Sequence, residues 1–156
     1  MRQEIILELI KRMPGITYNE IVRETGLSNG VISHYLIKLL DKKEIEKEGE
    51  RRGKYFEKNI PKKDRMLIIL LRNKTNNEIF KILMKHSFDD SILNSKEIRD
   101  IIKKSGSTIS VSLKALQNNN VIERVIMNKN VKLTNDIAYK ISNKKLWNRY
   151  IVKYNL

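Results

Sequence analysis

The sequence predicts a mainly α-helical protein with two small β wings, because one pattern of three helices and a hairpin occurs twice. Shifting the chain against itself by 77 residues places residues 16–59 on residues 93–136 without a gap. Self-similarity at a fixed period is the signature of a duplicated structural unit. Identical positions in the two copies include Glu20/Glu97, Ile21/Ile98, Ile32/Ile109, Ser33/Ser110, Leu36/Leu113, Leu39/Leu116, Ile45/Ile122 and Glu46/Glu123. Most of them lie at helical core spacings or in turns.

The first copy begins with two helices. Apolar residues at helical spacing predict a helix over residues 5–13, which the Pro14-Gly15 pair ends. Thr17 and Glu20 have the Thr-x-x-Glu form of a capping box and start a second helix. Gly26 is expected to end that helix, since glycine favours the position just after a helix C-terminus.

A third helix and a hairpin complete the first copy. Ser28 or Asn29 can cap a helix that runs to about residue 43. Two short β-prone runs, 44–48 and 54–58, then flank a glycine-bounded turn. Such runs around a turn indicate a β-hairpin.

The second copy repeats this order after a first helix around residues 79–83. Asn94 caps its second helix, with Glu97 three residues further on. The remaining predicted elements are the turn 105–107, a third helix over 108–119, and a hairpin with strands 121–127 and 131–133 around the turn 128–130.

Three helices followed by a two-stranded wing form the winged helix-turn-helix plan. We therefore expect two tandem winged helix-turn-helix domains, joined by a linker helix and followed by a C-terminal helix. The expected boundaries are 1–60 for domain 1, 61–74 for the linker helix, 75–136 for domain 2 and 137–156 for a basic amphipathic helix. For this last segment three interpretations are open: packing on domain 2, a dimer interface, or a membrane-surface helix.

The charge of the chain favours a polyanionic partner. There are 32 Lys and Arg against 18 Asp and Glu in 156 residues, a formal net charge of +14. Residues 1–60 contribute +2 and residues 61–156 contribute +12. A charge this far from zero attracts polyanions, of which nucleic acid is the commonest and an anionic membrane surface the main alternative.

Several other classes of protein are disfavoured. The chain has no cysteine, which rules out disulfides and thiolate metal sites, and its two histidines, His34 and His86, lie far apart in sequence. We expect no metal and no cofactor. No apolar run approaches the roughly 18 residues of a membrane span, and the N-terminus does not resemble a signal peptide. The protein is therefore expected to be soluble and cytoplasmic.

Two segments, 28–43 and 107–119, are the candidate recognition helices. The major groove of DNA admits one α-helix, and small or polar residues at the helix N-terminus let the backbone approach the bases. The candidate DNA-binding residues of the first helix are Ser28, Asn29, Gly30, Ser33, His34 and Lys38. Those of the second are Ser107, Thr108, Ser110, Ser112 and Lys114. Ser28, Asn29 and Ser107 can also be simple helix caps.

The wing at 51–54 is the main charged feature of the first copy. Arg51, Arg52 and Lys54 surround Gly53 at the expected hairpin tip. Arginine suits both bidentate phosphate contact and insertion into a narrow minor groove. The second wing has Lys129 and no arginine, so we expect it to contribute less. A solvated hairpin tip without a partner is the alternative.

The segment 15–40 resembles archaeal winged helix regulators of the broad MarR/ArsR-like type. The specific part is the turn Gly-Leu-Ser-Asn-Gly followed by Val-Ile-Ser-His-Tyr-Leu, and the wing Arg-Arg-Gly-Lys-Tyr-Phe at 51–56 fits the same pattern. Residues 107–116 are similar to the general winged helix pattern, whereas Asn118–Asn120 replace the acidic residue and glycine that are frequent there. The resemblance implies DNA binding and transcription regulation. Some tandem archaeal proteins of this type activate archaellum operons, which is the narrowest role it implies.

These observations bear on three possible functions. The first is a sequence-specific double-stranded DNA-binding transcriptional regulator. The second is a protein–protein interaction or dimerisation module in a transcription-related complex, with a homodimer through the linker or C-terminal helix and contacts with the transcription machinery. The third, an enzyme, is disfavoured because the sequence offers no nucleophile with a base, no credible carboxylate pair and no phosphate-binding loop.

Overall fold

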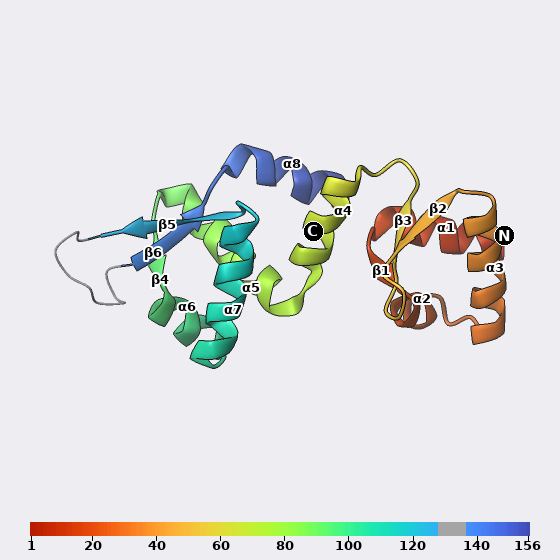
Figure 1. The fold of residues 1–156 in the computed structure, drawn as a ribbon, viewed down its shortest axis with the longest axis horizontal. Coiled ribbons are helices and arrows are strands. Elements are labelled where there is room, and N and C mark those ends of the chain that lie inside the picture. The colour runs from red at the N-terminus through yellow and green to blue at the C-terminus, as the bar shows by residue number, and fades with distance from the viewer. Residues whose placement is uncertain (128–136) are drawn as a thin grey trace. The chain divides into compact units, whose positions relative to one another are not determined.

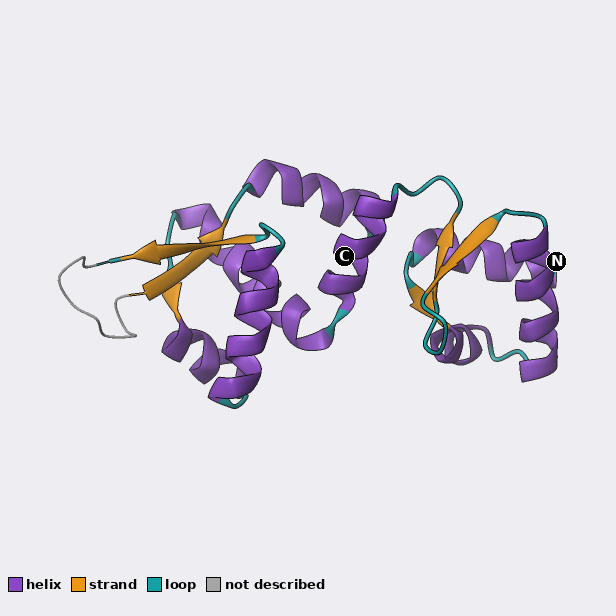
Figure 2. Cartoon of the chain, in the orientation of Figure 1, coloured by secondary structure: helices purple, strands orange, loops and turns teal. Residues whose placement is uncertain are grey.

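The computed structural model of the protein describes residues 1–127 and 137–156. The chain divides into two compact units, one made of residues 1–69 and 153–156 and the other of residues 70–152. Helices predominate in both, and each unit has one three-stranded antiparallel sheet (Figure 2). The mainly α fold with small β wings and a C-terminal helix is therefore confirmed.

In the first unit, a helical layer packs against a small sheet (Figure 1). Its elements are α1 (Arg2–Arg12), β1 (Ile16–Thr17), α2 (Tyr18–Thr25), α3 (Asn29–Asp41), β2 (Ile45–Glu48) and β3 (Lys54–Glu57), followed along the chain by α4 (Lys62–Arg72). The strand order is β1-β3-β2, so the hairpin β2–β3 is extended by the short strand before α2.

The second unit has the same order of elements. These are α5 (Lys74–His86), a short 3₁₀ turn (Ser87–Asp89), β4 (Leu93–Asn94), α6 (Ser95–Ile102), α7 (Gly106–Asn118), β5 (Ile122–Ile126), β6 (Ile137–Ile141) and α8 (Lys144–Tyr154). Its strand order, β4-β6-β5, matches that of the first sheet. Each hairpin is thus followed by a helix, and α8 occupies the place in the second half that α4 occupies in the first.

The strand register corrects the ungapped alignment of the two halves. Ile16 pairs with Tyr55 in the first sheet, and Leu93 pairs with Tyr139 in the second. The first members of these pairs differ by 77 residues, whereas the second members differ by 84. From the pair Ile45–Glu57 to the pair Ile122–Ile141 the second hairpin is therefore seven residues longer than the first, and the shift of 77 does not extend to residue 136.

The same register corrects the expected secondary structure of the C-terminal segment. Ile137–Ile141 is the return strand β6, so the helix that we expected over 137–156 covers only Lys144–Tyr154. The 77-residue shift predicted the return strand at 131–133 instead, because it took the length of the second hairpin from the first. That predicted strand and the turn 128–130 lie outside the described residues.

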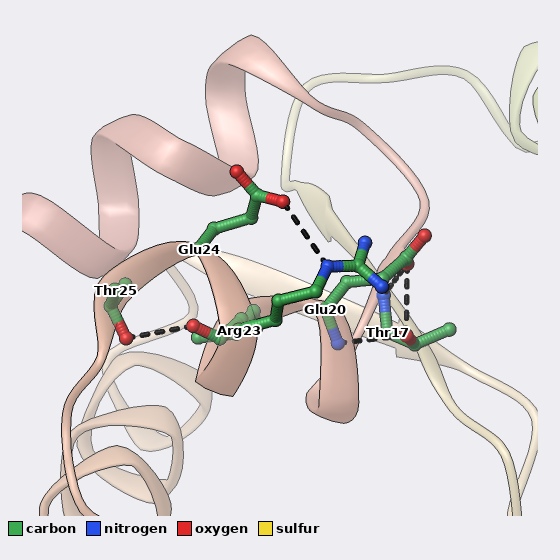
Figure 3. A network of polar contacts seen from close by, with 6 residues as sticks. Thr17, Glu20, Arg23, Glu24 and Thr25 are labelled. Atoms are coloured by element: carbon green, nitrogen blue, oxygen red, sulfur yellow. Dashed lines mark hydrogen bonds and ion pairs between the residues drawn. The ribbon is translucent and has the colours of Figure 1, made fainter.

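Helix caps position the second helix identically in the two units. Thr17 Oγ1 accepts a hydrogen bond from the backbone N–H of Glu20, at 3.3 Å, and the Glu20 carboxylate accepts one from Thr17 N–H at 2.7 Å (Figure 3). Asn94 and Glu97 make the same reciprocal pair at the start of α6. Both predicted caps are confirmed, and each orients the helix that precedes the predicted recognition helix.

The third helices differ at their N-termini. Ser28 holds the N-cap position of α3, but its side chain makes no capping hydrogen bond. In the second unit Ser105, not Ser107, is the cap, and its hydroxyl accepts from the N–H of Thr108 at 3.3 Å. Helix α7 therefore begins at Gly106, two residues earlier than predicted.

The core of each unit is formed by the apolar positions shared between the two copies. In the first unit Ile21, Ile32 and Leu39 are completely buried.

In the second unit, Trp147 of α8 is 2% exposed and meets Phe80 of α5 edge-on, with ring centroids 6.1 Å apart. Of the three interpretations of the C-terminal segment, packing on the second unit is the one that this burial supports.

A buried arginine ties the first hairpin to the helix that follows it. Arg65 is 7% exposed; its Nη1 donates to Glu48 Oε1 at 3.0 Å and contacts the Glu46 carboxylate, and its Nε donates to the carbonyl of Ile60 at 2.9 Å. Burial alone would lower the pKa of Arg65, but the hydrogen bonds and charges of Glu46 and Glu48 outweigh it and raise that pKa. The arginine therefore stays charged and holds β2 in place.

Candidate nucleic-acid interface

The N-terminal half of α3 presents small and polar side chains to solvent. Ser28, Asn29, Gly30 and His34 are exposed, and Ser33 is half-buried. Because the Ser28 hydroxyl makes no capping bond, it is available to a ligand. Gly30 has open space where a Cβ would stand, so its small size leaves the helix backbone accessible. Lys38, one turn beyond His34, is exposed as well.

Tyr18, which the sequence reasoning did not single out, joins α2 to the start of α3. Its hydroxyl donates to the backbone carbonyl of Asn29 at 2.9 Å and lies 3.0 Å from Ser33 Oγ. These two bonds fix the spacing between the first residue of α2 and the first turn of α3. A tyrosine directly after a capping threonine, eleven residues before the next helix begins, was the signal in the sequence.

The wing tip lies near α2, the helix that carries Tyr18. The turn between β2 and β3 ends beside α2 (Figure 1). A hollow of about 570 Å³ lies between the two, and its lining is made of Thr17, Tyr18, Asn19, Lys47, Arg51, Arg52, Gly53, Lys54 and Tyr55. Tyr18 thus contacts α3 and also lines the hollow that the wing cations border. Tyr18 therefore links the first turn of α3 to the hollow beside the wing.

Gly53 shapes the wing tip. A Cβ at this position would lie 2.0 Å from Cε and 2.8 Å from Cγ of Lys47, so the lysine stem crosses the site where a side chain would stand. Lys47 Nζ in turn donates to the carbonyl of Glu50 at 3.2 Å. The lysine charge is thereby directed to the turn, while Arg51 and Arg52 remain exposed.

Ile37 is a second residue that the sequence reasoning missed. It is 60% exposed on α3, one turn after Ser33 and His34. The core face of this helix consists of Ile32, Leu36 and Leu39, so an isoleucine at position 37 falls outside the core spacing, and that mismatch could have identified it. Apolar side chains on a recognition helix contact the methyl group of thymine.

The second unit presents fewer of its predicted residues. Ser107, Thr108, Ser110 and Lys114 are exposed along α7. Ser112 is a correction: it is 6% exposed and lies among the buried positions of the helix, so its hydroxyl does not face solvent and we drop it as a DNA contact. Lys129, predicted for the second wing, lies outside the described residues.

The described residues hold no group of three or more His, Asp or Glu side chains that could bind a metal ion. Within residues 1–127 and 137–156, no helix has the combination of length and apolar character that a membrane crossing requires.

Comparison with known proteins assigns the first unit. The family described as winged helix-turn-helix DNA-binding matches residues 3–42, which run from α1 to just past the end of α3. No curated protein matches the chain. The matched segment contains the whole helical part of the surface built above. The chain therefore has an N-terminal winged helix-turn-helix DNA-binding domain.

Proposed function

We propose that this protein is a sequence-specific double-stranded DNA-binding transcriptional regulator that acts by binding rather than by catalysis. The observation that carries the proposal is the position of Tyr18, which is bonded to the first turn of α3 and lines the hollow next to Arg51 and Arg52. A groove-reading helix and a backbone-contacting wing must lie on one surface to engage the same stretch of duplex.

On this surface the roles divide by chemistry. Asn29, Ser33 and His34 offer hydrogen-bonding groups to base edges or phosphates, and Ile37 offers an apolar contact to a thymine methyl. Arg51 and Arg52 are exposed cations for the phosphate backbone or a narrow minor groove. Lys38 on α3 and Lys54 on β3 add positive charge.

The proposal extends to the second unit, the cellular location and the oligomeric state. We propose that the second unit is also a winged helix domain, which makes the protein a tandem regulator. We further propose that it works in the cytoplasm, where DNA and the transcription machinery are accessible. Homodimerisation through residues 61–74 or 137–156 is a hypothesis that the symmetry of a DNA target would test. The narrower role as an archaellum-operon activator rests on sequence resemblance alone.

The decisive experiment is selection of bound duplexes from a random DNA pool at about 150 mM salt, where non-specific attraction is partly screened. An enriched motif is the expected result, and a palindromic motif would report a dimer. Binding without any motif would overturn sequence-specific reading and would favour the alternative of a protein-docking module.

The wing is tested by removing its charge. Arg51→Ala combined with Arg52→Ala should weaken binding to all sequences and lower the slope of log K against log salt by roughly 1–2, at about 0.9 per phosphate contact. Arg2→Ala with Arg12→Ala, which removes the same charge from α1, is the matched control. Equal slopes for the two double variants would remove the wing from the interface.

A further inference from the structure

The second unit has an open groove between its second and third helices, where Tyr18 bridges the corresponding gap of the first unit. The groove lies between α6 and α7, against β6, and has a volume of about 430 Å³. The residues that matter for its chemistry are Ser95, Lys96, Arg99, Ser110, Lys114 and Tyr139. Polar and charged side chains therefore predominate in its wall.

A single difference between the halves accounts for the opening. Tyr18 begins α2, and its side chain reaches across to Ser33 on α3. The residue that begins α6 is Ser95, which is too short to cross the equivalent gap. Ser110, the counterpart of Ser33, consequently has no hydrogen-bond partner for its hydroxyl among the described residues. The groove is the space that a tyrosine occupies in the first unit.

The groove is also more positive than its counterpart. Three of its lining residues are cations at positions where the first unit has neutral side chains: Lys96, Arg99 and Lys114 stand where Asn19, Val22 and Ile37 stand in the first unit. None of the three has an ion-pair partner among the described residues. The acidic residues of α6, Glu97 and Asp100, do not line the groove, and Glu97 is engaged in the helix cap.

Arg99 is already placed for an anion. Its Nη1 lies 3.3 Å from the point that a Cβ on Gly106 would occupy, so the guanidinium rests against the first turn of α7. A glycine at this position leaves room for the arginine head, where the first unit has Asn29. A guanidinium presents paired N–H donors that match the oxygens of a phosphate group.

We propose that the α6–α7 groove binds a phosphate group, and that this phosphate belongs to the backbone of the same double-stranded DNA that the first unit reads. Lys96, Arg99 and Lys114 supply the charge, and the Ser110 hydroxyl supplies a further donor. This inference rests on the proposed DNA-binding function. In this proposal the second unit binds the DNA backbone independently of sequence, while α3 of the first unit discriminates between sequences.

The test uses the full chain and changes two properties of the α6–α7 groove in separate variants, its open volume and its positive charge. Ser95→Tyr refills the groove with the side chain that the first unit has there and leaves every charge in place. Lys96→Ala with Arg99→Ala removes two cations. The control, Lys81→Ala with Lys85→Ala, removes two exposed cations of α5 that do not line the groove. Circular dichroism melts confirm that each variant folds.

The expected result is that Ser95→Tyr lowers the salt slope of DNA binding by about 0.9 and the groove double variant by roughly 1–2, with no change in sequence preference. The α5 control should keep the wild-type slope. A wild-type slope for Ser95→Tyr, or equal losses in the groove and control variants, would overturn the site and leave only diffuse attraction. If the wild-type chain bound no DNA, the proposed function would fail first, before the groove was tested.

A titration of the wild-type chain with inorganic phosphate in the absence of DNA separates the two sources of the ligand. Weak phosphate binding that Ser95→Tyr abolishes, together with a reduced DNA slope, supports a backbone phosphate. Phosphate binding that Ser95→Tyr abolishes while the DNA slope stays unchanged would overturn the DNA assignment and give the groove to a free phosphorylated ligand.

Discussion

The two units share their element order, strand order and second-helix caps, but they differ where each would meet a ligand. The first unit has Tyr18 bridging α2 and α3, whereas the second has Ser95 and an open groove. The first has a five-residue turn between β2 and β3, whereas the second hairpin is seven residues longer. The comparison teaches that the fold depends on the buried positions, while the exposed positions of the same elements are free to take on different chemistry.

The largest predicted effect on the free energy of unfolding concerns the helix that follows each hairpin, because the two units hold this helix by different contacts. In the second unit this helix is held by Trp147, which is buried against Phe80. Trp147→Ala should lower the free energy of unfolding of that unit by about 3–5 kcal/mol, since it removes a large buried ring and leaves a cavity. Urea unfolding followed by circular dichroism measures this. Val152→Ala, on an 85% exposed residue of the same helix, is the control and should change little.

In the first unit, ion pairs of Arg65 with Glu46 and Glu48 hold the corresponding helix. Arg65→Ala leaves Glu48 partly buried without its cation and should cost about 3 kcal/mol. Because Trp147 is the single tryptophan of the chain and lies in the second unit, its fluorescence should report an unchanged second transition while circular dichroism reports the loss. A simultaneous shift of both signals would show that the two units unfold together.

The helix caps provide a smaller, symmetric test. Thr17→Ala and Asn94→Ala each remove one half of a capping box and should each destabilise the protein by about 1 kcal/mol. Similar losses in thermal or urea unfolding would support structural equivalence of the two caps. A loss in one unit alone would show that tertiary contacts have replaced the cap in the other.

The smallest effect is expected at the end of the second helix. Gly26 ends α2 with a φ of 65°, and Lys103 ends α6 with a φ of 58°. A residue with a Cβ is strained in this left-handed region, and glycine is not. Lys103→Gly should therefore raise the free energy of unfolding by about 0.5–1 kcal/mol after the entropy of the added glycine is subtracted. Lys104→Gly, outside that conformation, should destabilise instead.

Local signals made most of the fold predictable. Helical spacing, the Thr17 and Asn94 caps and the end of α2 at Gly26 each depend on residues close together in sequence, and each was placed correctly. The turn expected at 105–107 was wrong, because α7 already begins at Gly106. The return strand β6 could not be placed in the same way, because its partner lies across a hairpin whose length no local pattern fixes. The repeat alignment supplied a length from the first hairpin, and that length was wrong.

The candidate site was less predictable than the fold. The polar residues at the start of α3 were identified because a recognition helix requires them, but which helix face is exposed depends on packing. Ser112 and Ile37 show this in opposite directions, since the serine is buried and the isoleucine is exposed. Tyr18 and Arg99 contribute through distances between helices, and no spacing along the sequence contains those distances.

The unequal hairpins bear on how this architecture can be altered. Loop-closure entropy grows only with the logarithm of length, so each doubling of a flexible connection costs about 0.6 kcal/mol. The paired residues at the base of both hairpins keep the same register despite the extra seven residues. The hairpin tip is therefore an insertion point at which a peptide tag, a dye-labelling sequence or a longer basic arm can be grafted with little thermodynamic penalty, and variation there can change reach without redesigning a core.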